Sequence, residues 1–170
     1  PPALILKTSG TSYCIKDQLE LEKRIHSIAS AYNKRPPIYL LYGNLTTSEL
    51  HELYNHKKVK CLITLTHGEG FGRPLLEASM NGLPIIASKW SGHLDFLPEK
   101  YTKLVQGETK KCDFLSDYTH TNANWFYVDK NKVNMALHDM VNRYEIHKKR
   151  ANKLMSINLK KFTLDAMAQR

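Results

Sequence analysis

Short apolar runs alternate with amphipathic segments along most of the chain. An apolar run of about four to eight residues suits a strand buried on both faces, while apolar residues three or four apart suit a helix with one buried side. The runs predict strands over Ala3–Lys7, Ile38–Tyr42, Lys60–Leu65, Pro84–Ser88 and Thr102–Gln106. Apolar strands that alternate with helices are typical of a parallel sheet covered on both faces. We therefore expect an α/β fold, a Rossmann-like parallel sheet with helices on both faces.

The helical segments are recognised by their spacing and by their ends. Helices are predicted over Asp17–Tyr32, Thr46–Asn55, Arg73–Asn81, Asn131–Tyr144 and His147–Lys160, and the tail FTLDAMAQR would add another. The segment Thr46–Glu49 has the spacing of a capping box, and Gly82 follows the third helix as a terminating glycine. The segment Gly107–Asn124 shows no period, so we expect a long loop there.

Length and composition narrow the class of protein. A chain of 170 residues with 42% hydrophobic residues is long enough to bury a core, so we expect one domain over residues 1–170. No run approaches the roughly 18 apolar residues of a membrane-spanning helix, and the first residues do not resemble a signal peptide. Cys14, Cys61 and Cys112 form no metal-ligand pattern, and the eight His are scattered. We expect a cytoplasmic protein without a metal site, cut from a longer chain.

The formal net charge of +9 raises the question of a nucleic-acid partner. Much of this charge lies in Arg143–Lys161, where the apolar residues keep helical spacing. No aromatic residues alternate with the basic ones to stack on bases. We interpret the segment as the solvated face of a helix, while noting that a phosphorylated ligand would also use positive charge.

The stretch THGEGFGRPLLEASM places a glycine-rich turn between a predicted strand and a predicted helix. Gly68, Gly70 and Gly72 allow a sharp turn and the close approach of a bulky ligand. The N-terminus of the next helix offers unpaired N–H groups and a partial positive charge to a phosphate. Carboxylates such as Glu69 and Glu77 repel phosphate but accept hydrogen bonds from sugar hydroxyls. Although each feature alone is common in ordinary turns and helices, the combination predicts a nucleotide-sugar site.

The segment Glu69–Glu77 resembles the Glu-x7-Glu motif of retaining GT-B glycosyltransferases, the group related to glycogen synthase and sucrose synthase (glycosyl transferases group 1). The likeness extends from about Ile38 to the C-terminus. It includes WSGHLDFL, where the family usually has a pair of glycines and then a glutamate. Here Ser91 stands at the first glycine and Asp95 at the glutamate.

The resemblance implies a donor-binding domain for a nucleotide-diphosphate sugar and a retaining transfer of the sugar without a metal or another cofactor. Glu69 would be the catalytic residue that contacts the donor sugar, and Glu77 would hold the ribose hydroxyls. The remaining donor-binding positions would be Gly70, Phe71, Gly72 and Arg73 along the sugar and diphosphate, Leu45 near the base, and Ser91 and Gly92 near the diphosphate.

The resemblance also shows what this segment does not contain. The family grips the diphosphate with an Arg and a Lys from an earlier Gly-Arg…Lys-Gly stretch, which neither Lys7 nor Lys16 matches. It also binds the acceptor with an N-terminal domain that we expect to be missing here, so this fragment alone would be inactive. The base, the sugar and the acceptor (a glycan, a lipid or a protein) stay open. The segment indicates neither a nucleic-acid partner nor membrane association.

Two other functions are consistent with parts of the sequence. A non-catalytic nucleotide-binding module that acts with a partner chain would need the same turn. An NADP-dependent Rossmann domain would need Gly-x-Gly-x-x-Gly, whereas Gly68, Gly70 and Gly72 have a different spacing. The pair Ser88-Lys89 after the next strand could accept a 2′-phosphate, so this alternative is not eliminated.

Overall fold

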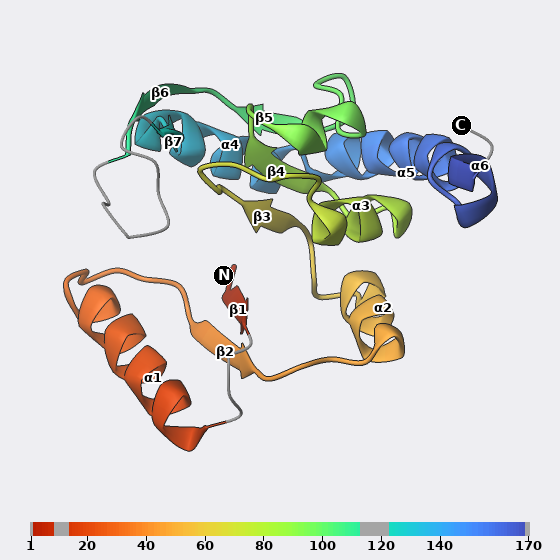
Figure 1. Ribbon diagram of the computed structural model, residues 1–170. Coiled ribbons are helices and arrows are strands. Elements are labelled where there is room, and N and C mark those ends of the chain that lie inside the picture. The colour runs from red at the N-terminus through yellow and green to blue at the C-terminus, as the bar shows by residue number, and fades with distance from the viewer. Residues whose placement is uncertain (1, 9–13, 113–122, 169–170) are drawn as a thin grey trace. The chain divides into compact units, whose positions relative to one another are not determined.

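The computed structural model describes residues 2–8, 14–112 and 123–168, which divide into two compact units. The units are Pro1–Leu50 and His51–Arg170. Both contain parallel strands and helices (Figure 1), which confirms the expected α/β class. The prediction of a single domain over residues 1–170 stays a prediction.

The first unit is a parallel pair of strands with one long helix between them in sequence. Its elements are β1 (Leu4–Thr8), α1 (Ile15–Ser30) and β2 (Ile38–Tyr42). The strands pair in register from Leu4 opposite Ile38 to Thr8 opposite Tyr42.

Helix α2 (Thr47–Asn55) contains the boundary between the two units, and its start confirms the predicted capping box. The Thr46 N–H donates to Glu49 Oε2 at 2.7 Å, and the Glu49 N–H donates to Thr46 Oγ1 at 3.2 Å. The hydrogen bonds from Thr46 hold the pKa of Glu49 below its usual value.

The second unit contains the glycine-rich turn and the core. Its elements are β3 (Leu62–Thr64), α3 (Arg73–Met80), β4 (Ile85–Ser88), the 3₁₀ turn η1 (Gly92–Asp95), β5 (Lys103–Val105), β6 (Gly107–Lys111), β7 (Asn124–Val128), α4 (Lys130–Asn142), α5 (Tyr144–Lys161) and α6 (Leu164–Ala168). Strands β3, β4 and β5 form a parallel sheet in that order. Helices α3 and α4 pack against its strands.

One cluster of core residues lies between the parallel sheet and α4. Ile86 and Val105 from the sheet pack with Ala136 and Met140 from the helix, all nearly inaccessible to solvent. Cys61 packs against this group, and burial raises the pKa of its thiol to about 11. A thiol with such a pKa is almost entirely protonated at neutral pH, so Cys61 acts as a packing residue.

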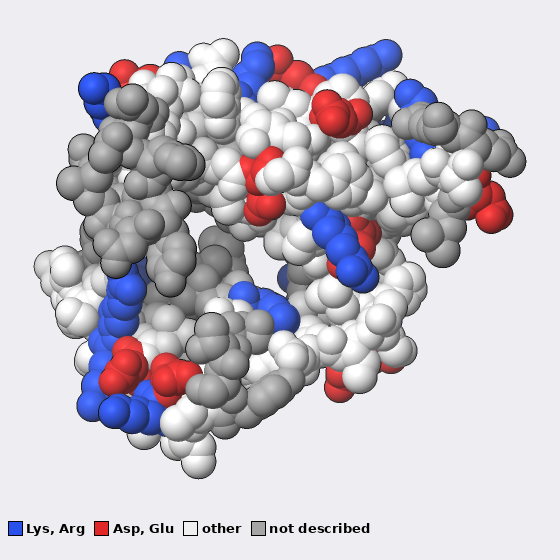
Figure 2. Space-filling model, viewed as in Figure 1, with Lys and Arg blue, Asp and Glu red and all other residues white. Residues whose placement is uncertain are grey.

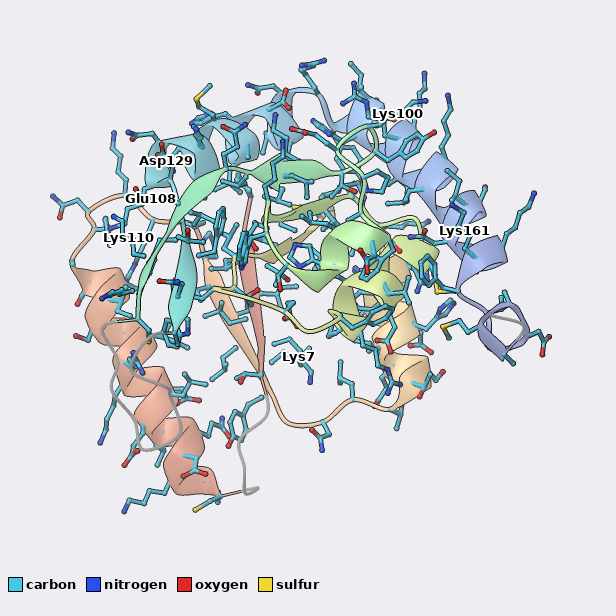
Figure 3. All side chains as sticks on the ribbon, turned by 45° about the horizontal axis from the view of Figure 1, so that its top comes forward. Lys7, Lys100, Glu108, Lys110, Asp129 and Lys161 are labelled. Atoms are coloured by element: carbon cyan, nitrogen blue, oxygen red, sulfur yellow. The ribbon has the colours of Figure 1, made fainter. Side chains whose placement is uncertain are left out.

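Helix α5 buries one stripe and exposes its charge. The buried residues are His147, Ala151, Leu154 and Asn158. The basic residues Lys149, Arg150, Lys153, Lys160 and Lys161 are exposed. Lys161 points away from the helix, as does Lys100 from its loop (Figure 3), and the face shown in Figure 2 carries Lys and Arg in small separate groups. The arrangement agrees with a solvated helix face.

The expected loop over Gly107–Asn124 is wrong at its ends. Strand β6 and strand β7 form an antiparallel ladder from Gly107 opposite Val128 to Lys111 opposite Asn124, and residues 113–122 lie outside the described chain. All of β6 is exposed, and Figure 3 shows Glu108 and Lys110 on it near Asp129, the N-cap of α4. A strand without apolar residues has no hydrophobic period, so its pairing with the aromatic β7 could not be seen in the sequence.

No helix in the described part of the chain is long and apolar enough to cross a membrane.

Replacement of Asn158 by Ala should destabilise the second unit by about 2–3 kcal/mol, because it leaves buried polar groups unpaired. The Asn158 amide donates to Ser79 Oγ at 2.8 Å and to the Phe96 carbonyl at 3.1 Å. Chemical denaturation measures the change. Asn152→Ala, an exposed position on the same helix, is the matched control, and an equal loss in both variants would contradict the prediction.

Asp139 should make stability depend on acid pH. Its carboxylate accepts from Lys103 Nζ at 2.8 Å, from His147 Nε2 at 3.0 Å and from Arg143 at 3.1 Å. The Lys103 hydrogen bond is the main cause of its lowered pKa, while burial acts in the opposite sense. A carboxyl with a lowered pKa stabilises the fold above its unfolded value, about 3.9, and this contribution is lost as the pH falls through the folded value.

We therefore expect Asp139→Asn to cost about 1–3 kcal/mol at neutral pH, with the difference from wild type shrinking below about pH 4. Unfolding free energies measured from pH 7 to 2 test this expectation. Asp165→Asn, an exposed carboxylate on α6, should change little. A difference that stays constant over the whole pH range would show that charge is not the cause.

Candidate active site

The glycine-rich turn joins β3 to α3, and Gly72 is its N-cap. Gly72 has φ 84° and ψ 51°, the left-handed region that favours glycine. Its carbonyl accepts hydrogen bonds from the N–H groups of Leu75 and Leu76. A Cβ at this position would lie 3.2 Å from the Cβ of His93. Gly72 is thus required by the backbone and by packing, not only by the approach of a ligand.

Three of the four residues around the start of α3, Gly70, Phe71 and Arg73, are exposed, and the fourth, Gly72, is buried. In the part of the chain that the structure describes, the N–H groups of Gly70, Phe71, Gly72 and Arg73 have no acceptor. A helix N-terminus carries a partial positive charge, so these groups suit an anion such as a phosphate. No atom lies within 4 Å of a Cβ built on Gly70, which leaves room at this point of the turn.

The backbone of Glu69 is held from the loop after β4. Ser91 Oγ donates to the Glu69 carbonyl at 2.6 Å and accepts from the Glu69 N–H at 3.1 Å. The Gly92 N–H donates to the same carbonyl at 3.0 Å. Among the described residues, none makes a hydrogen bond or an ion pair with the Glu69 carboxylate. The side chain is therefore available to a ligand while its backbone is fixed.

Ser91 adopts a conformation that is costly for any residue other than glycine. Its φ is 82° and its ψ is −170°, and it is the only non-glycine with a positive φ in the described chain. This region costs about 1–3 kcal/mol and persists only where the surroundings enforce it. Here the surroundings include the two hydrogen bonds with Glu69.

Glu77 lies one turn into α3 and is partly exposed. Arg73 Nε donates to Glu77 Oε1 at 2.8 Å, with the Arg73 side chain 84% and the Glu77 side chain 32% exposed. Burial, and secondarily the charge of Glu77, raises the pKa of Tyr54 to about 12. An exposed ion pair of this kind contributes little to stability, so a ligand can displace Arg73 from the carboxylate.

The end of α2 supports α3 beside Glu77. Tyr54 is buried, and its hydroxyl donates to the Pro74 carbonyl at 3.4 Å. Asn55 donates to the side chain of Asn81 at 2.6 Å, and Asn81 donates to the Glu77 carbonyl at 2.8 Å. Sequence reasoning did not predict the contacts of Tyr54 and Asn55, because they join side chains to residues 20 or more positions away in the chain.

Unpaired buried polar atoms lie near the carboxyl ends of β3 and β4. His93 is fully buried, and its Nε2–H donates to the Ser88 carbonyl at 2.7 Å. Within the described residues, His93 Nδ1, Ser88 Oγ and Thr66 Oγ1 have no partner. Ligands of open parallel sheets bind at this edge, and unpaired polar groups are unusual elsewhere in a native core.

Aromatic side chains of β7 support both loops. His67 stacks on Trp125 with ring centroids 4.8 Å apart, and its Nδ1 lies 2.8 Å from the Phe126 carbonyl. Trp90 is parallel to Phe126, with centroids 5.7 Å apart. The run NWFYV was the signal in the sequence, but the partners of these rings could not be predicted from it.

Phe71 links the turn to the end of α5. Its ring, 42% exposed, lies 5.1 Å from that of Phe96 and 6.4 Å from that of Phe162. Phe96 is buried beneath it. One side of the Phe71 ring thus packs against Phe96 and Phe162, and its exposed side can contact a ligand.

The structure brings most of the predicted site residues into one region. Glu69, Gly70 and Gly72 contact the loop that contains Ser91 and Gly92, and Arg73 and Glu77 follow on α3. Leu45 is half-buried between β2 and α2, in the segment assigned to the first unit, and its proximity to the base stays a prediction. No group of three His, Cys, Asp or Glu in the described residues could hold a metal ion, and metal independence likewise stays a prediction.

Two hollows in the described structure lie away from the turn. One, of about 580 Å³, is lined by residues of α1 and β2, and another, of about 440 Å³, is lined by residues of β6, β7 and the start of α4. Neither includes a residue of the glycine-rich turn. Within the turn itself, Gly70, Phe71 and Arg73 are exposed to solvent, whereas Gly72 is buried.

Comparison with known proteins identifies one family. Residues 3–116 match the family model described as glycosyl transferases group 1, and this range is more than half of the chain. It includes the glycine-rich turn, Glu77 and the loop with Ser91 and Gly92. None of the curated proteins matches the chain.

Replacement of Gly92 by Ala should destabilise the second unit by about 1–3 kcal/mol or more, as overpacking does. Its Cβ would lie 2.0 Å from the Gly70 carbonyl oxygen, and a backbone atom cannot rotate away. Gly70→Ala is the matched control, because its Cβ would meet nothing within 4 Å. Thermal unfolding measures the stability of both variants. Equal stability would contradict the prediction and show that residues 69–70 and 91–92 can move apart at little cost.

Proposed function

This chain belongs to the glycosyl transferases group 1 family, and from that premise we propose that it is the donor-binding part of a retaining glycosyltransferase with a GT-B fold. The observation that carries the proposal is the turn between β3 and α3. It combines four N–H groups without a partner in the described chain with Glu69 in the turn and Glu77 one helical turn later. A diphosphate with a sugar on each side has the matching chemistry.

The diphosphate of the donor would bind at the N-terminus of α3. The N–H groups of Gly70, Phe71, Gly72 and Arg73 would donate to its oxygens, and Ser91 and Gly92 would lie on the same side. The Arg73 guanidinium, which is 84% exposed, can turn from Glu77 toward a phosphate. This would supply a cation where the family's Arg and Lys motif is not matched.

Glu77 would accept hydrogen bonds from the two ribose hydroxyls. A carboxylate with two oxygens can accept from both hydroxyls of a diol. Arg73 occupies only Oε1, so a ribose could bind at Oε2 before Arg73 moves. Leu45 would contact the base through its backbone, which the resemblance implies.

Glu69 would contact hydroxyls of the donor sugar and orient the sugar at the reacting centre. Its contribution would be positioning, since catalysis in such sites depends on holding the reacting atoms in the productive geometry. We propose a metal-independent reaction without another cofactor. The helix end would stabilise the charge that develops on the leaving diphosphate.

A second domain would have to complete the site. Gly70, Phe71 and Arg73 in the turn are exposed to solvent. Transfer of a sugar to an acceptor other than water requires a closed site. We therefore propose that an N-terminal GT-B domain binds the acceptor, and that residues 1–170 alone transfer little sugar. We also propose a cytoplasmic location, which the odd number and wide spacing of Cys14, Cys61 and Cys112 support.

Calorimetric titration of this chain with UDP, GDP, ADP and NADP tests the proposal. One nucleoside diphosphate should bind, and Glu77→Ala should weaken it by about 1.5–3 kcal/mol, or about 10- to 150-fold, because hydrogen bonds to a charged group are lost. Glu145→Ala, an exposed glutamate on α5, is the matched control and should bind as wild type.

Three results would argue against the proposal or restrict it. Unchanged affinity in the Glu77 variant would remove this residue from the site. Preference for NADP would favour the oxidoreductase alternative. Binding of a nucleoside diphosphate by a protein that transfers no sugar, even with an acceptor-binding domain added, would favour the non-catalytic module.

A further inference from the structure

Ser91 holds Glu69 through the backbone and not through its carboxylate. The Ser91 hydroxyl both donates to the Glu69 carbonyl, at 2.6 Å, and accepts from the Glu69 N–H, at 3.1 Å. The Gly92 N–H adds a third hydrogen bond, at 3.0 Å. The peptide groups on both sides of the Glu69 Cα are therefore fixed, and its Cα–Cβ direction is fixed with them.

The backbone of Ser91 is strained at the position where its hydroxyl contacts Glu69. With φ 82° and ψ −170°, Ser91 occupies a region that is nearly exclusive to glycine. A glycine would adopt it at lower cost but would have no oxygen to bridge the Glu69 N–H and carbonyl. The strained conformation is thus accompanied by a contact that glycine cannot make.

The same contact leaves the Glu69 carboxylate available. Glu69 is partly exposed, and no described residue bonds to its carboxylate. A residue with a fixed backbone and an unengaged side chain is preorganised for a ligand, because less conformational freedom is lost on binding.

We propose that Ser91 is a positioning residue that presents the Glu69 carboxylate to hydroxyls of the donor sugar. The inference rests on the proposed function. It assigns the Ser91 hydroxyl to Glu69, whereas the resemblance implied only that Ser91 lies near the diphosphate. Removal of the hydroxyl should reduce recognition of the sugar and leave recognition of the nucleoside diphosphate intact.

The test compares each nucleoside diphosphate with its sugar form, UDP with UDP-glucose, GDP with GDP-mannose, and ADP with ADP-glucose. Dissociation constants give a sugar ratio, the Kd of the diphosphate divided by the Kd of its sugar form. Ser91→Gly should lower this ratio about tenfold, as loss of one charge-assisted hydrogen bond does, and change the Kd of the diphosphate less than about twofold. Glu69→Ala should lower the ratio as much.

The double variant Glu69→Ala/Ser91→Gly should be no worse than Glu69→Ala, because residues that act through one another are not additive. Ser156→Ala is the matched control, since it removes an exposed hydroxyl that also donates to a backbone carbonyl, that of Asn152, on α5 and outside the candidate site. Ser91→Ala keeps the Cβ and should give the same ratio as Ser91→Gly if it folds. Ser91→Gly tolerates the positive φ, so the result does not depend on the alanine variant.

Hydrogen exchange of the Glu69 amide provides a readout that needs no ligand. The amide should be protected in wild type and should exchange at least about tenfold faster in Ser91→Gly, because a bonded amide exchanges only on local opening. Unchanged protection would overturn the inference.

Failure of the inference can be distinguished from failure of the proposed function. A sugar ratio that Glu69→Ala lowers but Ser91→Gly does not would overturn only the role of Ser91. Equal losses for the diphosphate and its sugar form in Ser91→Gly, or additive losses in the double variant, would also overturn that role. If wild type binds none of the six ligands, or if Glu69→Ala leaves the ratio unchanged, the proposed function fails and this inference fails with it.

Discussion

The site depends on one contact between two backbone segments, residues 69–70 and 91–92. Gly92 lies so close to the Gly70 carbonyl that a Cβ would come within 2.0 Å of its oxygen. Three hydrogen bonds keep the segments together: Ser91 Oγ and the Gly92 N–H donate to the Glu69 carbonyl, and the Glu69 N–H donates to Ser91 Oγ. Since backbone atoms cannot change rotamer, this contact fixes where the turn leaves β3 and how the loop leaves β4.

Buried side chains next to the turn also help to fix its position in the second unit. His93 follows Gly92, is fully buried, and lies against Gly72 at the start of α3. Phe71 packs on Phe96 and on Phe162 at the end of α5. Residues far from the turn in sequence thus determine the direction of α3 and of its N–H groups. Changes in α5 should therefore affect the site through Phe162 without contacting a ligand.

The sequence predicted the elements that have a local cause, and it missed those whose cause lies in distant contacts. Apolar runs predicted β2 to the residue, and the capping-box spacing predicted the hydrogen bonds between Thr46 and Glu49. The exposed β6 carried no period and was expected to be a loop. Its order comes from pairing with β7, a partner that follows residues 113–122.

The same distinction applies to the candidate site. Glu69 and Glu77 could be proposed from spacing, because a strand, a turn and a helix place them regardless of the rest of the chain. The role of Ser91 could not be proposed from the sequence. The positive φ of Ser91 and the partner of its hydroxyl both depend on a contact with Glu69, 22 positions away in sequence. The resemblance suggested a serine that merely replaces a glycine. The geometry shows contacts of the Ser91 hydroxyl that a glycine could not make. These contacts hold the backbone of Glu69 and leave its carboxylate without a partner among the described residues.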